Sequence, residues 1–239
     1  MLSQSYLETA RGPIFPLKTA ADQAPSPGDS LHRYLSNAAI RRVEAKQMVF
    51  AEGDPAHHVY RIETGAVSLF KVLADGRRQI LGFAYAGDLI GLGIHSDYVM
   101  NAQALGELRI RAMPRAALHK IAAVDAGMSF KLYQAISEEL AATRDLMMTT
   151  GHRSACERVA GFLVALSRRN ERAGKCAGIV ELPMTRADIA DFLGLTIETV
   201  SRTLTKLRAR RLIDLPQSAR VVLLDNDALQ ELARGENGH

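Results

Sequence analysis

The stretch from Leu195 to Arg211 reads LTIETVSRTLTKLRARR, and it predicts an amphipathic helix. Apolar residues recur at spacings of three and four, which places them in one stripe along the helix: Ile197, Val200, Leu204 and Leu207. Thr196 has the side chain of a good N-cap, and basic residues are concentrated at the far end of the run. We expect the stripe to pack against a neighbouring element, while the opposite side of the helix faces solvent.

The solvent side of this helix carries three polar residues that would project together. Glu198, Ser201 and Arg202 stand at i, i+3 and i+4 in its first two turns. These residue types suit a DNA major groove, because Arg donates two hydrogen bonds to guanine, Glu accepts one from cytosine, and a small hydroxyl fits beside thymine. The alternative is a solvated, charge-rich surface helix in which Glu198 only favours the helix N-terminus.

The segment before this helix favours DNA binding over that alternative. Thr185 is a second N-cap candidate, with the acidic Asp188 three residues later, and a short apolar run ends at Gly194. Only Leu195 then separates this glycine from Thr196. Two short helices joined by so tight a turn must cross steeply, which is the arrangement of a helix-turn-helix.

The run MTRADIADFLGLTIETVSRTLTKL, residues 184–207, resembles the helix-turn-helix of CRP/FNR-family transcription regulators. In the FNR branch the recognition helix carries a Glu-x-x-Ser-Arg set, which corresponds here to Glu198, Ser201 and Arg202. The likeness extends from about residue 35 to residue 232 and is greatest to the FixK branch, which activates genes for low-oxygen life and nitrogen fixation.

This resemblance implies an α+β chain with an N-terminal antiparallel β-roll, like that of cyclic-nucleotide-binding domains, a long dimerisation helix and a C-terminal winged helix-turn-helix. It implies a homodimer that binds double-stranded DNA and works with RNA polymerase. The half-site would be TTGA, with Ser201 near its thymine, so that a two-fold dimer reads TTGA-N6-TCAA. Six further residues are expected to contact the DNA backbone: Thr185, Arg186, Thr196, Thr199, Lys206 and Arg220.

The whole chain has 239 residues, 47% of them hydrophobic, and a formal net charge of +4. That length suits two ordinary domains better than one. Residues 153–220 hold 13 Lys or Arg against 7 Asp or Glu, so positive charge is concentrated where a polyanion would bind. Two cysteines, no long apolar run and no signal-like N-terminus lead us to expect a cytoplasmic protein with no membrane contact.

The chain divides into segments of different texture. Residues 1–29 contain scattered prolines and no sustained period, which predicts a disordered tail. We expect the β-roll at 30–127, the dimerisation helix at 128–152 and the DNA-binding domain at 153–239. In the β-roll, Gly-centred turns separate apolar segments at 48–51, 59–62, 67–72, 79–85 and 108–113; this pattern by itself indicates only a small barrel or sandwich.

Residues 129–150 run for 22 positions without Gly or Pro. Spacings of three and four predict a two-stranded coiled-coil seam at Tyr133, Ile136, Leu140, Thr143 and Met147. The alternative is a helix packed on its own domain, for which the same stripe would serve. By resemblance, the position of Thr143 is acidic in the FNR branch, and an uncharged Thr carries no repulsion across a dimer seam.

The C-terminal domain shows several further elements. A helix is expected at 155–169, a strand at 179–182, and a hairpin with strands at 212–215 and 221–224 joined by a turn at residues 216–218. Arg220 lies beside this wing tip. A last helix is expected at about 227–233, and residues 235–239 should fray.

Ligand signatures are missing from the predicted β-roll. The family holds cyclic nucleotide with a Glu after a Gly-Asp-x-x-Gly turn and with an Arg-Ser or Arg-Thr pair, whereas this chain reads GDLIGLG at 87–93 and MNAQ at 100–103. An FNR-type iron–sulfur cluster needs four thiolates, and residues 1–155 contain no Cys. We therefore expect no cofactor. The alternative function is that of a family member that senses a small molecule, haem or nitric oxide through the β-roll.

Enzyme and metal sites are not indicated. His57 and His58 are adjacent, so on a strand they point to opposite faces, and His95 has no second ligand at a useful spacing. No Gly-x-Ser-x-Gly motif, phosphate loop or Cys-His pairing suggests catalysis. We expect a protein that is not an enzyme.

Cys176 is a candidate redox switch. It lies in a Gly-bordered loop with Arg172 and Lys175, whose positive charges would favour the reactive thiolate. The alternative is an exposed thiol without consequence.

Overall fold

The computed structural model describes residues 30–130, 132–133, 136–137, 140 and 153–235. They fall into two compact units, one holding the described residues up to 137 and the other those from 140 onward. The predicted tail at 1–29 and the predicted seam residues Thr143 and Met147 lie outside the described residues. The domain limits given above stay predictions.

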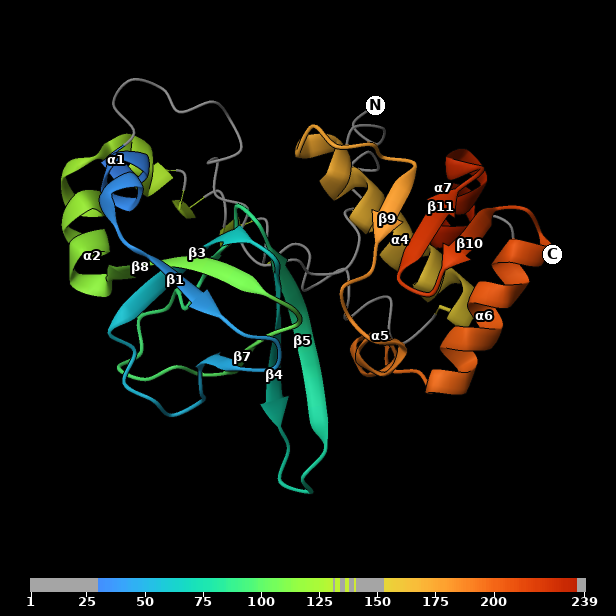
Figure 1. Cartoon of the computed structure of the whole chain (residues 1–239), viewed down its shortest axis with the longest axis horizontal. Coiled ribbons are helices and arrows are strands. Elements are labelled where there is room, and N and C mark those ends of the chain that lie inside the picture. The colour runs from blue at the N-terminus through green and yellow to red at the C-terminus, as the bar shows by residue number, and fades with distance from the viewer. Residues whose placement is uncertain (1–29, 131, 134–135, 138–139, 141–152, 236–239) are drawn as a thin grey trace, which may run out of the picture. The chain divides into compact units, whose positions relative to one another are not determined.

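The first unit is an antiparallel β-roll made of two sheets (Figure 1). One sheet has the strand order β1-β8-β3-β6 and the other β2-β7-β4-β5. The strands are β1 (Ile40–Val43), β2 (Met48–Phe50), β3 (His58–Thr64), β4 (Ala66–Val72), β5 (Arg78–Tyr85), β6 (Leu89–Ile90), β7 (Asn101–Ala104) and β8 (Leu108–Pro114). The predicted strands are confirmed, and β1, β6 and β7 add to them.

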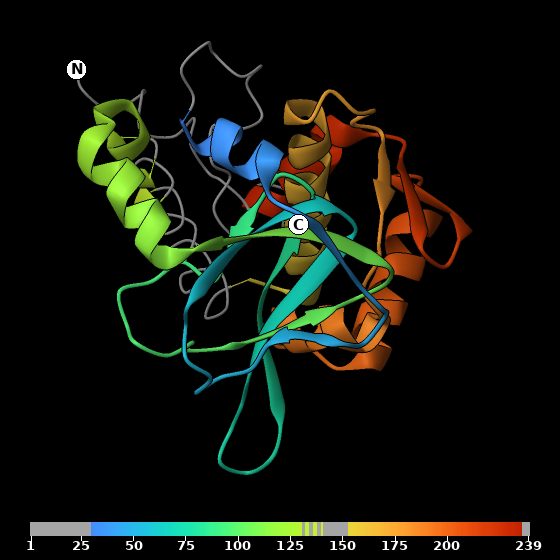
Figure 2. The same cartoon turned by 60° about the vertical axis from the view of Figure 1, so that its left-hand side comes forward.

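Glycines fix the tight turns between these strands. Gly65, between β3 and β4, has φ of 93°, and a Cβ there would lie 2.5 Å from the carbonyl oxygen of Glu107. Gly87, before β6, has φ of 94°. Only glycine takes such angles without strain, so the turns predicted at these positions are confirmed. Between β4 and β5, a long hairpin extends past the rest of the roll in both views (Figures 1 and 2).

Two helices complete this unit, α1 (Ser30–Asn37) and α2 (Arg115–Val124). Leu35 of α1 and Leu118 of α2 are buried against Met113 of β8. The Arg111 side chain of β8 donates hydrogen bonds to carbonyls at the end of α1, including that of Leu35 at 3.0 Å. Both helices are therefore fixed to the roll by apolar packing, and α1 also by capping of its free carbonyl groups.

The second unit packs helices against a small sheet with the order β10-β11-β9. Its elements are α4 (Ala155–Arg172), β9 (Ile179–Glu181), α5 (Arg186–Leu193), α6 (Ile197–Ala209), β10 (Ile213–Gln217), β11 (Arg220–Leu223) and α7 (Asn226–Arg234). Phe162 of α4 and Phe192 of α5 are buried with ring centroids 5.9 Å apart. This is the predicted winged helix-turn-helix, with α4 longer than expected at its C-terminal end.

The predicted position of the wing turn is wrong. Pro216 and Gln217 belong to β10, and the connection to β11 is Ser218–Ala219. The register between the two strands shifts between Asp214 and Gln217. A proline fits in such an irregularity because no ladder hydrogen bond from its nitrogen is required there.

Candidate DNA-binding site

Local capping builds the helix-turn-helix. At the start of α5, the Thr185 hydroxyl accepts from the Asp188 backbone N–H at 3.1 Å, and the Asp188 carboxylate accepts from the Thr185 backbone N–H at 2.9 Å. Gly194 ends this helix with φ of 64° and ψ of 42°, the left-handed conformation that glycine favours. The hydroxyl of Thr196 then accepts from the Thr199 backbone N–H at 3.2 Å and starts α6. Both predicted N-caps and the predicted turn are confirmed.

The buried side of α6 differs in one position from the predicted stripe. Val200, Leu204 and Leu207 are buried, and Thr203 is buried with them. Ile197 is 48% exposed, so its prediction as a core residue is wrong. At about 100° per residue, the side chains of 200, 203, 204 and 207 span one arc of the helix, and Ile197 falls at its margin.

Glu198, Ser201 and Arg202 are exposed together on the other side of α6. In the part of the chain that the structure describes, the Arg202 guanidinium makes no hydrogen bond or ion pair. The pKa of the Glu198 carboxyl lies below its ordinary value, because its own backbone N–H and the Thr196 hydroxyl bond the carboxylate, with Arg202 contributing a smaller attraction. This side of the helix thus presents an ionised acceptor, the Glu198 carboxylate, which suits cytosine. It also presents a bidentate donor, the Arg202 guanidinium, which suits guanine.

The six residues expected to contact the DNA backbone are placed differently from one another. Lys206 is exposed near the end of α6, and the hydroxyls of Thr196 and Thr199 lie 3.0 Å apart at its start. Thr185 is exposed beside α5, with its hydroxyl donating to Asp188 at 2.7 Å.

Arg186 and Arg220 have partners within the domain. Nη2 of Arg186 donates to the Ser218 carbonyl in the wing turn at 2.9 Å, and burial lowers the pKa of this guanidinium. Nε of Arg220 lies 3.1 Å from the Glu181 carboxylate across the small sheet. Arg186 therefore links α5 to the wing turn, and Arg220 links β11 to β9. Contact of either arginine with DNA stays a prediction.

Arg158 of α4 is a positioning residue that the sequence did not indicate. Its Nη1 donates to the Leu193 carbonyl at 3.1 Å and lies 3.5 Å from that of Gly194, while Nε donates to the Arg153 carbonyl at 3.0 Å. One guanidinium thus joins the first described residue of this segment to the turn between α5 and α6. Periodicity carries no signal for such a contact, because its partners lie 35 and 36 residues away.

The described part of the predicted dimer seam is exposed. Residues 126–130, 132–133, 136–137 and 140 are helical, and the seam residues Tyr133, Ile136 and Leu140 are 67%, 58% and 49% exposed. Large apolar side chains at this spacing are normally covered in a stable protein. Whether this stripe is a dimer seam or packs on its own domain stays a prediction.

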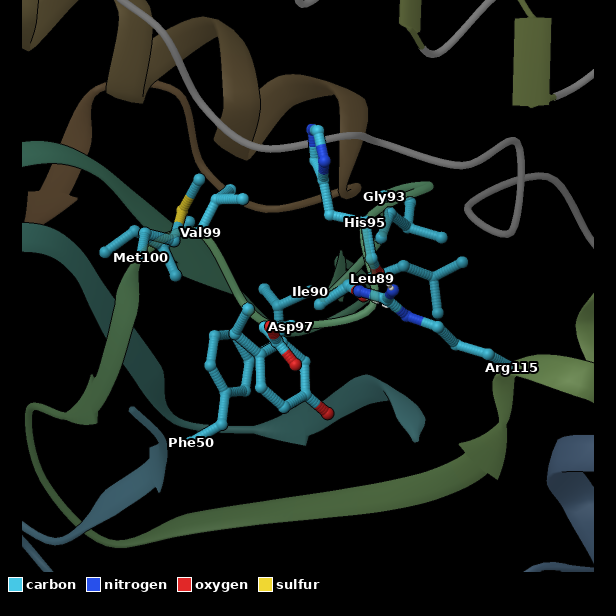
Figure 3. A pocket seen from close by; sticks show the side chains of 13 residues that line it. Phe50, Leu89, Ile90, Gly93, His95, Asp97, Val99, Met100 and Arg115 are labelled. Carbon is cyan, nitrogen blue, oxygen red and sulfur yellow. Dashed lines mark hydrogen bonds between the residues drawn. The ribbon is translucent and has the colours of Figure 1, made fainter. Parts of the chain in front are cut away.

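The β-roll contains a small cavity of about 70 Å³. It lies between the segment 91–100 and strands β2, β4 and β6, and its mostly apolar lining includes Phe50, Leu89, Val99 and Met100 (Figure 3). No cation was predicted in this region from the sequence. In the structure the Arg115 side chain extends from the start of α2 into the lining of the cavity.

This cavity is smaller than an ordinary ligand pocket. Its volume is far below the roughly 300–1,000 Å³ of ordinary ligand pockets. The carbonyl oxygens of Gly91 and His95 accept hydrogen bonds from Arg115, and Asp97 adds a carboxylate to the lining. The N–H donors of Arg115, the kind of group that a phosphodiester would need, are therefore already bonded within the protein.

Three further predictions concern the thiol of Cys176, metal sites and membrane-spanning helices. Cys176 is an exposed free cysteine that forms no disulfide. Among the described residues, no group of three or more His, Cys, Asp or Glu side chains is arranged to hold a metal ion. None of the helices in the described ranges has the length and apolar character needed to cross a membrane.

Comparison with known proteins gives two family matches and close relatives. A Crp-like helix-turn-helix domain matches residues 157–232, and a cyclic nucleotide-binding domain matches residues 40–125. The nitrogen fixation regulation protein FixK of Azorhizobium caulinodans is 36% identical over 97% of this chain and 90% of that protein. The transcriptional activatory protein AadR of Rhodopseudomonas palustris is 40% identical over 76% of each chain. The solved structure of FixK2 from Bradyrhizobium japonicum covers 82% of this chain and 96% of its own, with 36% identity and a TM-score of 0.76.

Proposed function

Because this chain belongs to the CRP/FNR family of DNA-binding transcription regulators and is most similar to its FixK branch, we propose that it activates low-oxygen or nitrogen-fixation genes as a homodimer on TTGA-N6-TCAA sites. Its relatives are transcription regulators and not enzymes. Activation would involve RNA polymerase as the partner of the DNA-bound dimer.

The observation that carries this proposal is the exposed set on α6. Glu198, Ser201 and Arg202 project together from the second helix of a capped helix-turn-helix, the helix that enters a major groove. Arg202 makes no competing hydrogen bond or ion pair with any residue that the structure describes, so its full fork of donors is available to guanine O6 and N7. Ser201 would lie beside the thymine of the half-site.

The exposed face at Tyr133, Ile136 and Leu140 supports a two-fold dimer. A second copy of the same helix would cover these side chains, and it would also place a second α6 one helical turn along the DNA. Thr143 and Met147 continue the same spacing in the sequence. Because Thr143 is uncharged, this seam lacks like-charge repulsion, so the dimer should form without an activating ligand.

The β-roll supports regulation without a small molecule. Its cavity is small, and the N–H donors of Arg115, the cation in its lining, are already bonded to the carbonyl oxygens of Gly91 and His95. Control would then act on the amount of protein or on oxidation of Cys176, and the role of this thiol stays a prediction.

Fluorescence anisotropy in air tests the proposal, with purified protein and a TTGA-N6-TCAA duplex, with and without cyclic AMP. We expect binding without added nucleotide or metal and the same affinity when cyclic AMP is present, because a ligand shifts an equilibrium only through differential contacts. A duplex with both half-sites scrambled serves as the control. Binding that requires anaerobic cofactor loading, or a tenfold gain with nucleotide, would favour the ligand-sensing alternative.

A further inference from the structure

Arg115 makes an unusual set of contacts for a residue at the start of a helix. Its Nε and Nη2 donate to the Gly91 carbonyl at 3.2 and 2.8 Å, and Nη1 donates to the His95 carbonyl at 2.6 Å. Its backbone N–H donates to the His57 carbonyl at 2.8 Å. One residue therefore fixes the start of α2 both to the residue before β3 and to the segment 91–100, as Figure 3 shows for the side chain.

The segment 91–100 depends on such contacts for its conformation. It contains no helix or regular strand, and its backbone bonds to residues 53–56 lie near Asp97, where the Ser96 and Tyr98 carbonyls accept from Ala56 and Gly53. Arg115 bonds two further carbonyls of the segment, which would otherwise need other partners. The charge also makes each bond stronger than one between neutral groups.

An aromatic pair holds the same segment from the side of the sheets. The Tyr98 ring stacks on Phe50 with centroids 3.9 Å apart, and its hydroxyl donates to the His58 carbonyl at 2.7 Å. The Arg115 guanidinium carbon lies 5.5 Å from the centre of the Tyr98 ring, within the range of a cation–π contact. Phe50 and Tyr98 thus provide a rigid wall for the guanidinium.

Gly91 allows this close packing. Its φ is +80°, and a Cβ would lie 3.1 Å from both the His58 carbonyl oxygen and the Tyr98 ring. Its own carbonyl accepts two of the three hydrogen bonds that the Arg115 side chain donates. The backbone is therefore turned so that an acceptor, and not a donor, faces the cavity.

We propose that the Arg115 guanidinium is an internal ligand of the β-roll, which takes the place of a bound small molecule and fixes the segment 91–100 to α2. The site is thereby a receptor for a planar cation, with two backbone carbonyls and an aromatic face as its walls. In the sequence α2 is followed by the exposed helical residues Tyr133, Ile136 and Leu140, so the same contact restrains the start of the segment that leads to the proposed dimer face. This inference deepens the ligand-independent function and rests on it.

Chemical rescue tests the proposal on the full-length protein without DNA. In Arg115→Ala we expect the melting midpoint to fall by about 5 °C or more. Backbone amides of residues 91–100 should exchange with solvent at least tenfold faster. Methylguanidinium at roughly 10 mM, a concentration suited to a millimolar fragment affinity, should restore much of both losses. Methylammonium has the charge without the planar fork of donors and should restore little.

Matched variants separate this role from a general effect on stability. Arg77→Ala removes an exposed arginine of the same domain, and methylguanidinium should leave its melting and exchange unchanged. Arg115→Lys keeps the charge and serves if the alanine variant does not fold; it should show faster exchange at 91–100 while most other amides keep their protection.

Three results would overturn the internal-ligand proposal: unchanged exchange at 91–100 in Arg115→Ala, equal rescue by methylammonium and methylguanidinium, or equal rescue of Arg77→Ala. The anisotropy assay on the unaltered protein judges the proposed function separately. If that protein fails to bind the palindrome, the DNA-binding proposal fails, while melting and exchange still decide the role of Arg115.

Discussion

Replacing Arg202 with alanine should abolish most of the preference for TTGA sites. The Arg202 side chain is exposed and makes no hydrogen bond or ion pair within the described ranges, so its loss should change the free energy of unfolding by less than about 0.5 kcal/mol. A bidentate contact to guanine is worth roughly 1–3 kcal/mol of discrimination. Two half-sites bring this to about 2–6 kcal/mol for the dimer, which corresponds to a loss of specific affinity between about 30-fold and 10⁴-fold.

The assay is fluorescence anisotropy of Arg202→Ala on the TTGA-N6-TCAA duplex and on a scrambled duplex, at several salt concentrations. Affinity should fall on the specific duplex and change little on the scrambled one. Lys206→Ala is the matched control from the same helix, and as a phosphate contact it should weaken both duplexes alike. It should also lower the slope of log affinity against log salt by about 0.9 per subunit. Equal losses of Arg202→Ala on both duplexes would refute base reading and show that Arg202 contacts phosphate.

Four further substitutions test other parts of the site. Ser201→Gly should relax or shift preference at the first base of the half-site, and unchanged selection at that base would remove Ser201 from the readout. Leu140→Asp should yield a monomer in sedimentation, because two desolvated carboxylates facing each other cost several kcal/mol; an intact dimer would place the seam elsewhere. Arg158→Ala should lower affinity about tenfold and speed amide exchange at residues 193–196, while Arg202 remains exposed; unaltered exchange there would mean that Arg158 does not hold the turn. Peroxide should weaken DNA binding of the unaltered protein but not of Cys176→Ser, and equal sensitivity of the two would exclude a redox role for this thiol.

The features predicted correctly from the sequence depend on residues close together in the chain. Thr185 and Asp188 form a capping box over four positions, and Gly194 follows because the helix must end in a left-handed turn. Gly65 and Gly87 mark turns for the same local reason. Long amphipathic helices such as α4 are predicted equally well, because their hydrophobic period is repeated several times.

The strands that were missed have weak local signals. The sequence of β7 is Asn-Ala-Gln-Ala, and β6 has only two residues, Leu89 and Ile90. Both exist because β4 and β3 offer edges with free hydrogen-bonding groups. Pro216 was expected in a turn because proline has a strong local preference for turns. It lies in β10 instead, because the irregular pairing of β10 with β11 accommodates it.

By itself the sequence determined the helix-turn-helix, the exposed polar side of its second helix and the lack of the family's cyclic-nucleotide-binding residues, since each depends on a short motif or a helical period. Tertiary structure alone decided how these parts are held. Arg115 meets Gly91 across 24 residues, and Arg158 meets Leu193 across 35. An arginine side chain is long and can bond any carbonyl within its reach, so its partner depends on which backbone the fold brings near it and not on its neighbours in the chain.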